Sequence, residues 1–383
     1  MPPRVQPSRR IHLFLSSHSK PLPMNGTWTR GSLAERLAMS WRGPRAAADE
    51  PLDIFGELRR ARKLLLMPND RVGGLFLGAT TYQSVRQQYT DARISLLTDV
   101  RWRALAGKIP FVDEVLVTAS EHKVWSPEFR ELVQKLRGES YDLVLCLGPD
   151  CSYRLAQLCG LSGARLRVGF QRQGLTPYNI EIVRRSEMVY EVDQYESLLR
   201  ILGLDVCGEV QWTIGDGKSS QLRERYLDGD FASGSVVGID LSGGEGQGLS
   251  GRQLDDIVGR VIERGARVVL FFSLAERKQV NYLKRTYGSR VLPFVQDDLS
   301  GVAALLEGCR ALISCNTDVL HLAISLHLPC VAIFGEDARR WVSGRNELVE
   351  VVQDRDIRAV SITQVVQALD RALRSLADAA AVE

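Results

Sequence analysis

The chain has 383 residues, with 49 Lys and Arg against 46 Asp and Glu and a hydrophobic content of 45%, an ordinary globular composition long enough for two domains. No apolar run approaches the roughly 18 residues needed to cross a bilayer. The apolar patch at residues 11–15 is too weak for a secretory signal. These features exclude fibrous, wholly disordered and membrane-spanning proteins, and we do not expect secretion.

The sulfur and imidazole side chains show no ligand spacing. The seven cysteines and five histidines contain no CxxC or HExxH arrangement. Several cysteines lie in or beside apolar runs, as buried thiols do. We therefore expect free thiols in a reducing cytoplasm, no metal site and no cofactor.

The net charge of +3 conceals an uneven distribution. Residues 1–63 carry 12 Lys and Arg against 5 Asp and Glu, which leaves the remainder net negative. A nucleic-acid-binding domain would carry a basic face on its folded body. The charge pattern therefore argues against a nucleic-acid partner.

Residues 1–50 are interpreted as a basic, largely disordered extension without a strand pattern. Leu33, Leu37 and Trp41 recur at helical spacing and predict a short basic helix with one apolar stripe. Two roles stay open for this helix: docking on the protein's own body, or peripheral contact with the anionic inner face of a membrane. A second short helix is expected to open at residues 51–57.

From residue 63 onwards, apolar runs alternate with helical stretches, which is typical of α/β domains with parallel strands. Strands are expected at residues 63–67, 93–97, 114–117, 141–147, 166–170, 236–241, 267–272, 290–293, 311–315 and 329–334, and helices at 75–89, 126–137, 153–161 and 194–202. The polar stretch 215–218 suits an interdomain connection. We therefore predict two doubly wound domains, residues 51–215 and 216–383, facing a ligand cleft.

Three turns between a strand and a helix carry candidate binding groups. The first, residues 69–74, ends in paired glycines, which allow a ligand close to the backbone; a tight structural turn is the alternative. The second, residues 241–251, holds five glycines and could offer N–H groups to a phosphate, or could simply be flexible. The third, residues 314–323, is a well-capped helix start that could also hold an anionic phosphate.

The motifs around the third turn resemble those of glycosyltransferase family 9, the heptosyltransferases that use ADP-heptose to build lipopolysaccharide. The family pattern Asp-Thr-Gly-x-x-His-Leu-Ala stands here as residues 316–323, followed by a strand ending in Phe334-Gly335 and by Trp341. Weaker resemblances follow in the family's order from residue 63 to about residue 370. The resemblance implies a GT-B fold of two Rossmann-like domains, the first for the acceptor and the second for the nucleotide sugar.

The resemblance also assigns roles to residues. The donor, a nucleotide-diphosphate sugar such as ADP-heptose, would contact the second domain. The residues implied for this contact are Ser242, Gly243, Gly244, Arg252, Glu276, Asn316, Thr317, Asp318 and His321. Arg252 would replace the family's phosphate-binding Lys, because Arg can bind phosphate in a bidentate manner.

The chain departs from the family at its catalytic position. An inverting transfer needs a carboxylate that deprotonates the acceptor hydroxyl, and where the family has this Asp the chain has Gly74. Asp70, four residues earlier, is the candidate substitute. Asn316 and Asp318 also differ from the family's Asp and Gly, and a carboxylate at Asp318 would oppose a bound diphosphate.

Three functional hypotheses follow from these observations. The first is a divergent, metal-independent, inverting glycosyltransferase that acts on a lipopolysaccharide or another cell-surface or lipid-linked glycan. The second is a catalytically impaired GT-B protein that acts as a binding or structural module. The third is a related epimerase, which would convert a free nucleotide sugar without an acceptor. The expected location is the cytoplasm, peripheral to the inner membrane if the extension binds lipid.

Overall fold

A computed structural model describes most of the chain after residue 52. The described residues are 11–13, 53–70, 73–119, 123–149, 151–171, 177–184, 190–208, 217–227, 235–243, 248–297, 299–335, 337–344 and 346–380. The chain divides into two compact units between Glu209 and Val210. The helix predicted around residues 33–41, Gly244 in the second turn, and the membrane contact assigned to the extension lie outside the described residues.

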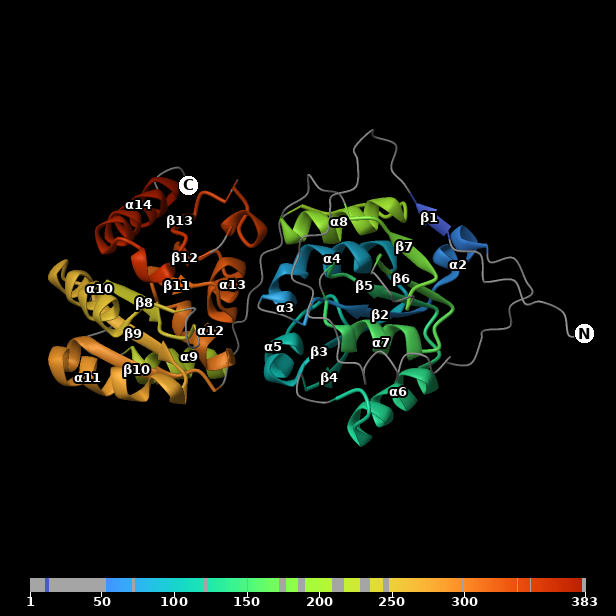
Figure 1. Cartoon of the computed structure of the whole chain (residues 1–383), viewed down its shortest axis with the longest axis horizontal. Helices are drawn as coiled ribbons and strands as arrows, with labels where there is room; N and C mark the ends of the chain where they lie inside the picture. The colour runs from blue at the N-terminus through green and yellow to red at the C-terminus, as the bar shows by residue number, and fades with distance from the viewer. Residues whose placement is uncertain are drawn as a thin grey trace, which may run out of the picture. The chain divides into compact units, whose positions relative to one another are not determined.

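The first unit is built on a seven-stranded parallel sheet with the order β1-β7-β6-β5-β2-β3-β4 (Figure 1). Its strands are β1 (Ile11–Leu13), β2 (Lys63–Met67), β3 (Arg93–Asp99), β4 (Glu114–Thr118), β5 (Leu143–Cys146), β6 (Leu166–Phe170) and β7 (Ile180–Ile182). Its α-helices are α2 (Ile54–Arg60), α3 (Gly74–Leu77), α4 (Ala79–Gln88), α5 (Arg103–Ala106), α6 (Pro127–Glu139), α7 (Tyr153–Leu161) and α8 (Glu191–Ile201). Apart from β1, the order is that of a Rossmann sheet, in which the first and fourth strands are neighbours.

The second unit repeats this order in a six-stranded parallel sheet, β10-β9-β8-β11-β12-β13. Its strands are β8 (Val236–Asp240), β9 (Arg267–Phe272), β10 (Val291–Val295), β11 (Ala311–Cys315), β12 (Cys330–Phe334) and β13 (Val349–Gln353). Its α-helices are α9 (Gly217–Tyr226), α10 (Gly251–Glu263), α11 (Arg277–Tyr287), α12 (Leu299–Leu306), α13 (Asp318–Ser325) and α14 (Ile362–Ala380). The structure therefore confirms the predicted pair of doubly wound α/β domains.

Helices cover both faces of each sheet, as parallel strands require. In the first unit, α4 and α8 contact each other on one face, and α6 and α7 on the other (Figure 1). In the second unit, α10 packs against α14 and α11, and α12 packs against α9 and α13. Both sheets are consequently buried between layers, and their carboxyl ends are left for ligands.

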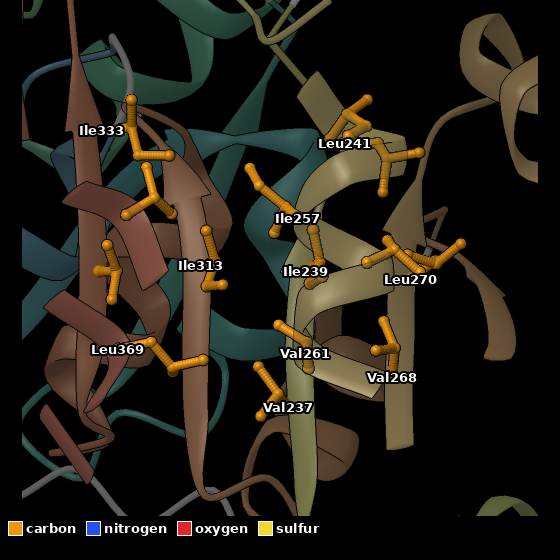
Figure 2. Close-up of a cluster of buried hydrophobic side chains, with 14 of the residues drawn as sticks. Val237, Ile239, Leu241, Ile257, Val261, Val268, Leu270, Ile313, Ile333 and Leu369 are labelled. Carbon is orange, nitrogen blue, oxygen red and sulfur yellow. The ribbon is translucent and has the colours of Figure 1, made fainter. Parts of the chain in front are cut away.

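The core of the second unit shows how one helix face closes a sheet face. Ile257 and Val261 of α10 and Leu369 of α14 lie against the side chains of β8, β9, β11 and β12 (Figure 2). The three helix side chains are at most 1% exposed. Full burial of an Ile, Val or Leu side chain contributes about 1.5–3 kcal/mol to folding, so this face holds α10 firmly in place.

The sequence placed most strands correctly, with three strands missed and one pair of helices predicted as a single helix. Strands β2, β6, β9 and β11 have the predicted bounds. The short strands β7 and β13 were not predicted, and the expectation of no strand before residue 50 is wrong at β1, which pairs in parallel with β7. The helix predicted at residues 75–89 is two helices, α3 and α4, which meet at Gly78.

The break at Gly78 has a local cause. The hydroxyl of Tyr82 donates a hydrogen bond to the carbonyl of Leu75 at 3.0 Å and lies where a side chain at residue 78 would project. A glycine is therefore needed at this junction. No helix in the described part of the chain is both long and apolar enough to cross a membrane.

Candidate functional site

The strand order locates two candidate edges, one in each unit. In an open parallel sheet, ligands bind outside the carboxyl ends of the strands, where neighbouring strands lead to opposite faces. This point lies between β2 and β5 in the first unit and between β8 and β11 in the second. Most of the residues singled out from the sequence follow these strands.

Asp240, the last residue of β8, organises the edge of the second unit. Its Oδ1 accepts hydrogen bonds from the backbone N–H of Ser242 at 2.9 Å and from the Ser242 hydroxyl at 2.5 Å. Its Oδ2 accepts from the hydroxyls of Ser314 at 3.0 Å and Thr317 at 2.6 Å. One buried carboxylate thus joins the turn after β8 to the turn after β11.

The surroundings of Asp240 act on its pKa in opposite directions. Burial raises the pKa of Asp240, while the hydrogen bonds from Ser242, Thr317 and Ser314 favour the ionised form and lower it. Burial is the larger effect, so the pKa lies above its ordinary value. Because both oxygens of the side chain have hydrogen-bond donors, we interpret Asp240 as a group that holds the two turns in register.

The start of α10 carries an exposed cation. Ser250 caps this helix in a reciprocal capping box with Gln253, whose amide group also donates to backbone carbonyls of residues 357–360. Arg252 lies in the first turn and is exposed. Within the described part of the chain, it has no ion pair or hydrogen-bond partner. A free guanidinium beside a fixed helix N-terminus is a suitable binding group for an anion.

The start of α13 carries two of the predicted residues. The hydroxyl of Thr317 caps the helix by accepting from the Leu320 N–H at 3.3 Å, and it donates to Asp240. Thr317 is 8% exposed, so its hydroxyl serves the interior of the domain. Asp318 is the first residue of α13 and is half-buried. Its negative charge interacts favourably with the helix dipole at this end.

His321 lies inside the domain. It is 2% exposed, its Nε2 lies 3.0 Å from Oδ1 of Asn316, and its ring centroid lies 6.0 Å from that of Trp341. Burial lowers the pKa of His321 to about 4, so the ring is neutral at neutral pH. A neutral, buried imidazole holds the Asn316 side chain in position and supplies no positive charge to a phosphate.

Two further groups complete the second edge. Glu276 accepts through Oε2 from the backbone N–H and the hydroxyl of Ser273, and this capping box fixes the turn after β9. The guanidinium of Arg340 lies 4.6 Å from the ring centroid of Trp341, within the range of a cation–π contact. Ser242 and Gly243 are half-buried in the turn after β8.

In the first unit, the turn after β2 is tied to two helices. The amide of Asn69 donates to Oε1 of Glu191, in the first turn of α8, at 3.0 Å. Asp70 accepts from the backbone N–H of Ser152 at 2.9 Å and from the Ser152 hydroxyl, and it lies 3.7 Å from the guanidinium of Arg154. Because Ser152 is the N-cap of α7, Asp70 anchors that helix.

Gly74 opens α3 and is buried. A Cβ atom placed there would lie 1.7 Å from the backbone oxygen of Asn69. No side chain fits at that distance, so the backbone around Gly74 is closed to the carboxylate that the family resemblance implies. Gly73, the preceding residue, has φ 72°, a conformation that favours glycine.

Sequence reasoning missed several groups at these edges. Asp240, Thr98 and Asp99 lie at the carboxyl ends of buried strands, and a polar residue at the end of an apolar run was the available signal. The sequence motif gave Trp341 no role of its own, although its ring packs against His321. Among the described residues, no cluster of three or more His, Cys, Asp or Glu is arranged to hold a metal ion.

Part of the chain matches a known protein family, and most of it is similar in sequence to known proteins. The model of the family described as glycosyltransferase family 9 (heptosyltransferase) matches residues 251–361 of the second unit. The chain is 21% identical over 295 residues to lipopolysaccharide heptosyltransferase 2 of Escherichia coli, covering 71% of this chain and 82% of that protein. A heptosyltransferase 2 of Salmonella typhimurium is 22% identical over 297 residues, with the same shares covered.

Solved structures agree on the fold. A glycosyltransferase family 9 protein of Veillonella parvula superposes with a TM-score of 0.71 and 16% identity, over 82% of this chain and 97% of the other. E. coli ADP-heptose lipopolysaccharide heptosyltransferase II superposes with a TM-score of 0.67 and 18% identity, over 82% and 99%. The fold and the solved structures together define a two-domain, GT-B-like α/β protein.

The family model and the curated relatives show that the chain is similar to heptosyltransferases of glycosyltransferase family 9. The family match spans α10 and the β11–α13 turn, where Arg252, Asn316, Thr317, Asp318 and His321 lie.

Proposed function

We propose that this chain transfers a sugar from a nucleotide-diphosphate donor, with ADP-heptose as the first candidate, to a hydroxyl of a lipopolysaccharide or related cell-surface glycan. The transfer would invert the anomeric centre and need no metal ion. The observation that supports the proposal most strongly is the edge formed by β8, β11, α10 and α13. This edge combines the Rossmann strand order, two capped helix N-termini and the exposed Arg252 within a segment that matches the family.

The residues of this edge would divide the work of donor binding. The helix N-termini and Arg252 would hold the diphosphate and stabilise the negative charge that develops on it as it leaves. Asp240, Thr317 and His321 would keep the two turns in place without touching the phosphates. Asp318 would oppose the diphosphate, which predicts weaker donor binding than a neutral residue would give.

A nucleotide-binding and turnover experiment tests the proposal. The full chain is titrated with ADP, UDP, GDP and their sugars in a thermal-shift assay, and labelled nucleotide sugars are then incubated with and without a lipopolysaccharide core acceptor. We expect stabilisation by one nucleotide and acceptor-dependent release of the nucleoside diphosphate. Release no greater than that of the denatured chain would contradict the proposal.

A matched pair of arginine variants locates the donor site. Arg252→Gln removes the cation at the start of α10, and we expect it to weaken nucleotide binding at least about tenfold, as the loss of a charge-assisted hydrogen bond predicts. Arg285→Gln, an exposed Arg in the last turn of α11, should leave binding unchanged. Equal binding by both variants would place the donor elsewhere.

One observation favours a second candidate function. The closed backbone at Gly74 leaves the chain without a carboxylate at the position implied by the family resemblance, as expected for a GT-B protein that binds a glycan or a partner without catalysis. In that case the chain would bind a nucleotide or glycan but release no nucleoside diphosphate. The same turnover assay separates the two functions.

We also propose that the protein is located in the cytoplasm, at the inner face of a membrane. All seven cysteines are free thiols, which suits a reducing cytoplasm. The basic residues 1–50 would bring the chain to the inner face of a membrane where lipid-linked acceptors reside. Flotation with anionic liposomes should recover the full chain, and equal recovery of a form lacking residues 1–50 would contradict the tether.

A further inference from the structure

A small pocket lies at the carboxyl ends of strands in the first unit. It has room for about one water molecule and is shaped by side chains that follow β2, β3 and β4 together with one from α7. Its polar lining residues are Asn69, Asp70, Thr98, Asp99 and Thr118, and its apolar lining residues are Pro68, Leu97, Trp102 and Leu155.

Asp99, the last residue of β3, is held on one side only. It is 2% exposed, and its Oδ1 accepts from the backbone N–H of Arg101 at 3.0 Å and from the Nε–H of Arg101 at 2.9 Å. Its Oδ2 is buried and has no hydrogen-bond partner within the described part of the chain, nor has the hydroxyl of Thr98, the preceding residue of β3. Buried polar atoms are rarely left unpaired, so the unpaired carboxylate oxygen of a residue that lines this pocket calls for a hydrogen-bond donor, such as a water molecule or the hydroxyl group of a ligand.

Neighbouring side chains hold Oδ1 of Asp99 in position. The guanidinium of Arg101 lies 5.3 Å from the ring centroid of Trp102, and Trp102 is 1% exposed with its ring 6.5 Å from that of Phe76 in α3. Trp102 therefore holds Arg101, and Arg101 holds Oδ1 of Asp99. This arrangement leaves Oδ2 in a defined position, as a group that receives a proton requires.

The two other positions considered for a carboxylate are not available. Gly74 has no room for a side chain because the carbonyl of Asn69 lies in its place. Both oxygens of Asp70 accept hydrogen bonds from Ser152, and Arg154 lies beside them. Asn69 and Asp70 nevertheless line the same pocket as Asp99, so Asp99 lies beside the turn that leads to the missing carboxylate.

We propose that Asp99 is the catalytic base of this chain and that its pocket receives the acceptor hydroxyl. The inference rests on the proposed sugar transfer. In the step, the acceptor O–H bond breaks and its proton passes to Oδ2 of Asp99. The acceptor oxygen forms a bond to the anomeric carbon, and the bond from that carbon to the phosphate oxygen breaks. The nucleoside diphosphate leaves with the electron pair. The Thr98 hydroxyl donates a hydrogen bond to the acceptor and orients it.

The test compares Asp99→Asn and Asp99→Glu with the wild-type chain. Asp99→Asn keeps the size of the side chain but cannot take a proton, so we expect kcat to fall at least about 100-fold while the Kd for the nucleotide stays within twofold. The acidic limb of the pH–rate profile should disappear. Asp99→Glu keeps a carboxylate, and its acidic limb should remain even where kcat is lower.

Asp70→Asn is the matched control from the same pocket. It replaces one of the two oxygens that accept from Ser152 with an NH2 group, so it should lower the unfolding midpoint while leaving the acidic limb of the pH–rate profile intact. The other charged groups near the pocket, Arg101 and Arg154, keep their charge across this pH range. Unfolding midpoints of all variants show whether each is folded under assay conditions.

The outcomes separate the two proposals. Turnover by Asp99→Asn within threefold of wild type, or an acidic limb that persists in that variant, would overturn the assignment of Asp99 and leave sugar transfer standing. Loss of the acidic limb in Asp70→Asn but not in Asp99→Asn would move the base to Asp70. A wild-type chain that turns over no nucleotide sugar would overturn sugar transfer and the base assignment together.

Discussion

Asp240 in the second unit and Asp99 in the first both end a buried strand at the carboxyl edge of a Rossmann sheet, and both are 2% exposed. The two carboxylates differ in their partners. Asp240 has donors on both oxygens, from Ser242, Ser314 and Thr317, whereas Asp99 has donors on one oxygen only among the residues that the structure describes. A carboxylate with hydrogen-bond donors on both oxygens stabilises the turns around it. A carboxylate with donors on one oxygen can still accept a proton on the other. The same sheet position thus serves structure in one domain and, we propose, chemistry in the other.

The largest expected effect comes from removing the carboxylate of Asp240. Asp240→Ala removes the acceptor of four donor groups and separates the turns after β8 and β11, so we expect the free energy of unfolding of the second unit to fall by about 4 kcal/mol. Nucleotide binding should be lost as well. Urea denaturation followed by circular dichroism measures the change.

Asp370→Ala is the control for this variant. Asp370 pairs with Arg264 at 3.1 Å, but its side chain is 41% exposed, so its loss should cost less than about 1 kcal/mol. Equal effects of the two substitutions would mean that Asp240 does not organise the edge, and the contrast with Asp99 would fail.

The buried His321 predicts a pH dependence of stability. Its pKa is about 4 in the folded chain and about 6.5 when unfolded, so the unfolded chain binds more protons between these values. The stability that neutral His321 contributes is fully present above pH 6.5. As the pH falls towards 4 this stability is lost, and the free energy of unfolding decreases by about 3 kcal/mol in total. Urea unfolding at pH 7.5 and 4.5 should show a smaller loss for His321→Gln than for wild type. Equal losses would mean that His321 is not the buried, neutral group described above.

A smaller effect is expected at Gly74 in the first unit. Gly74→Ala forces a Cβ atom against the carbonyl of Asn69 and should destabilise the chain by about 2 kcal/mol. Gly138→Ala, in α6 with no atom within 4 Å of the added Cβ, should stabilise it by about 0.5 kcal/mol. Thermal unfolding compares the two variants. A Gly74→Ala or Gly74→Asp protein as stable as wild type would reopen the family position to a carboxylate and weaken the case for Asp99.

The smallest effect concerns the charge at the start of α13. Asp318→Asn removes a negative charge from the proposed diphosphate site and should tighten ADP binding by about 1 kcal/mol, roughly fivefold. Isothermal titration of the two proteins at low salt gives the difference. Weaker binding by Asp318→Asn would indicate that the carboxylate assists the ligand, and the second edge would then need a different chemical description.

Much of the architecture was predictable because parallel strands buried on both faces appear as continuous apolar runs. The runs at Lys63–Met67 and Arg267–Phe272 gave their strands with the right bounds. Strand β13 was missed because residues 349–353 alternate in burial and exposure at the sheet edge and form no apolar run. Strand β1 is three residues long, and only its pairing with β7 makes it a strand.

The candidate site was predictable in location but not in detail. Glycine content and capping patterns led to the correct turns, because local sequence determines how a helix begins. Side-chain partners could not be predicted, because they join distant segments: Asp240 meets Thr317, and Asp70 meets Ser152. Asp99 was overlooked since its strand was expected to end at Leu97, two residues before the carboxylate.

Sugar transfer is the central claim, and mass spectrometry of the acceptor tests it most directly. A lipopolysaccharide core oligosaccharide is incubated with ADP-heptose and the full chain, and both the oligosaccharide and the released nucleotide are measured. The account predicts an oligosaccharide heavier by one heptose residue, with one ADP released for each transfer. An unchanged oligosaccharide, in a reaction where the same protein binds ADP, would contradict the account and indicate a nucleotide-binding protein without transferase activity.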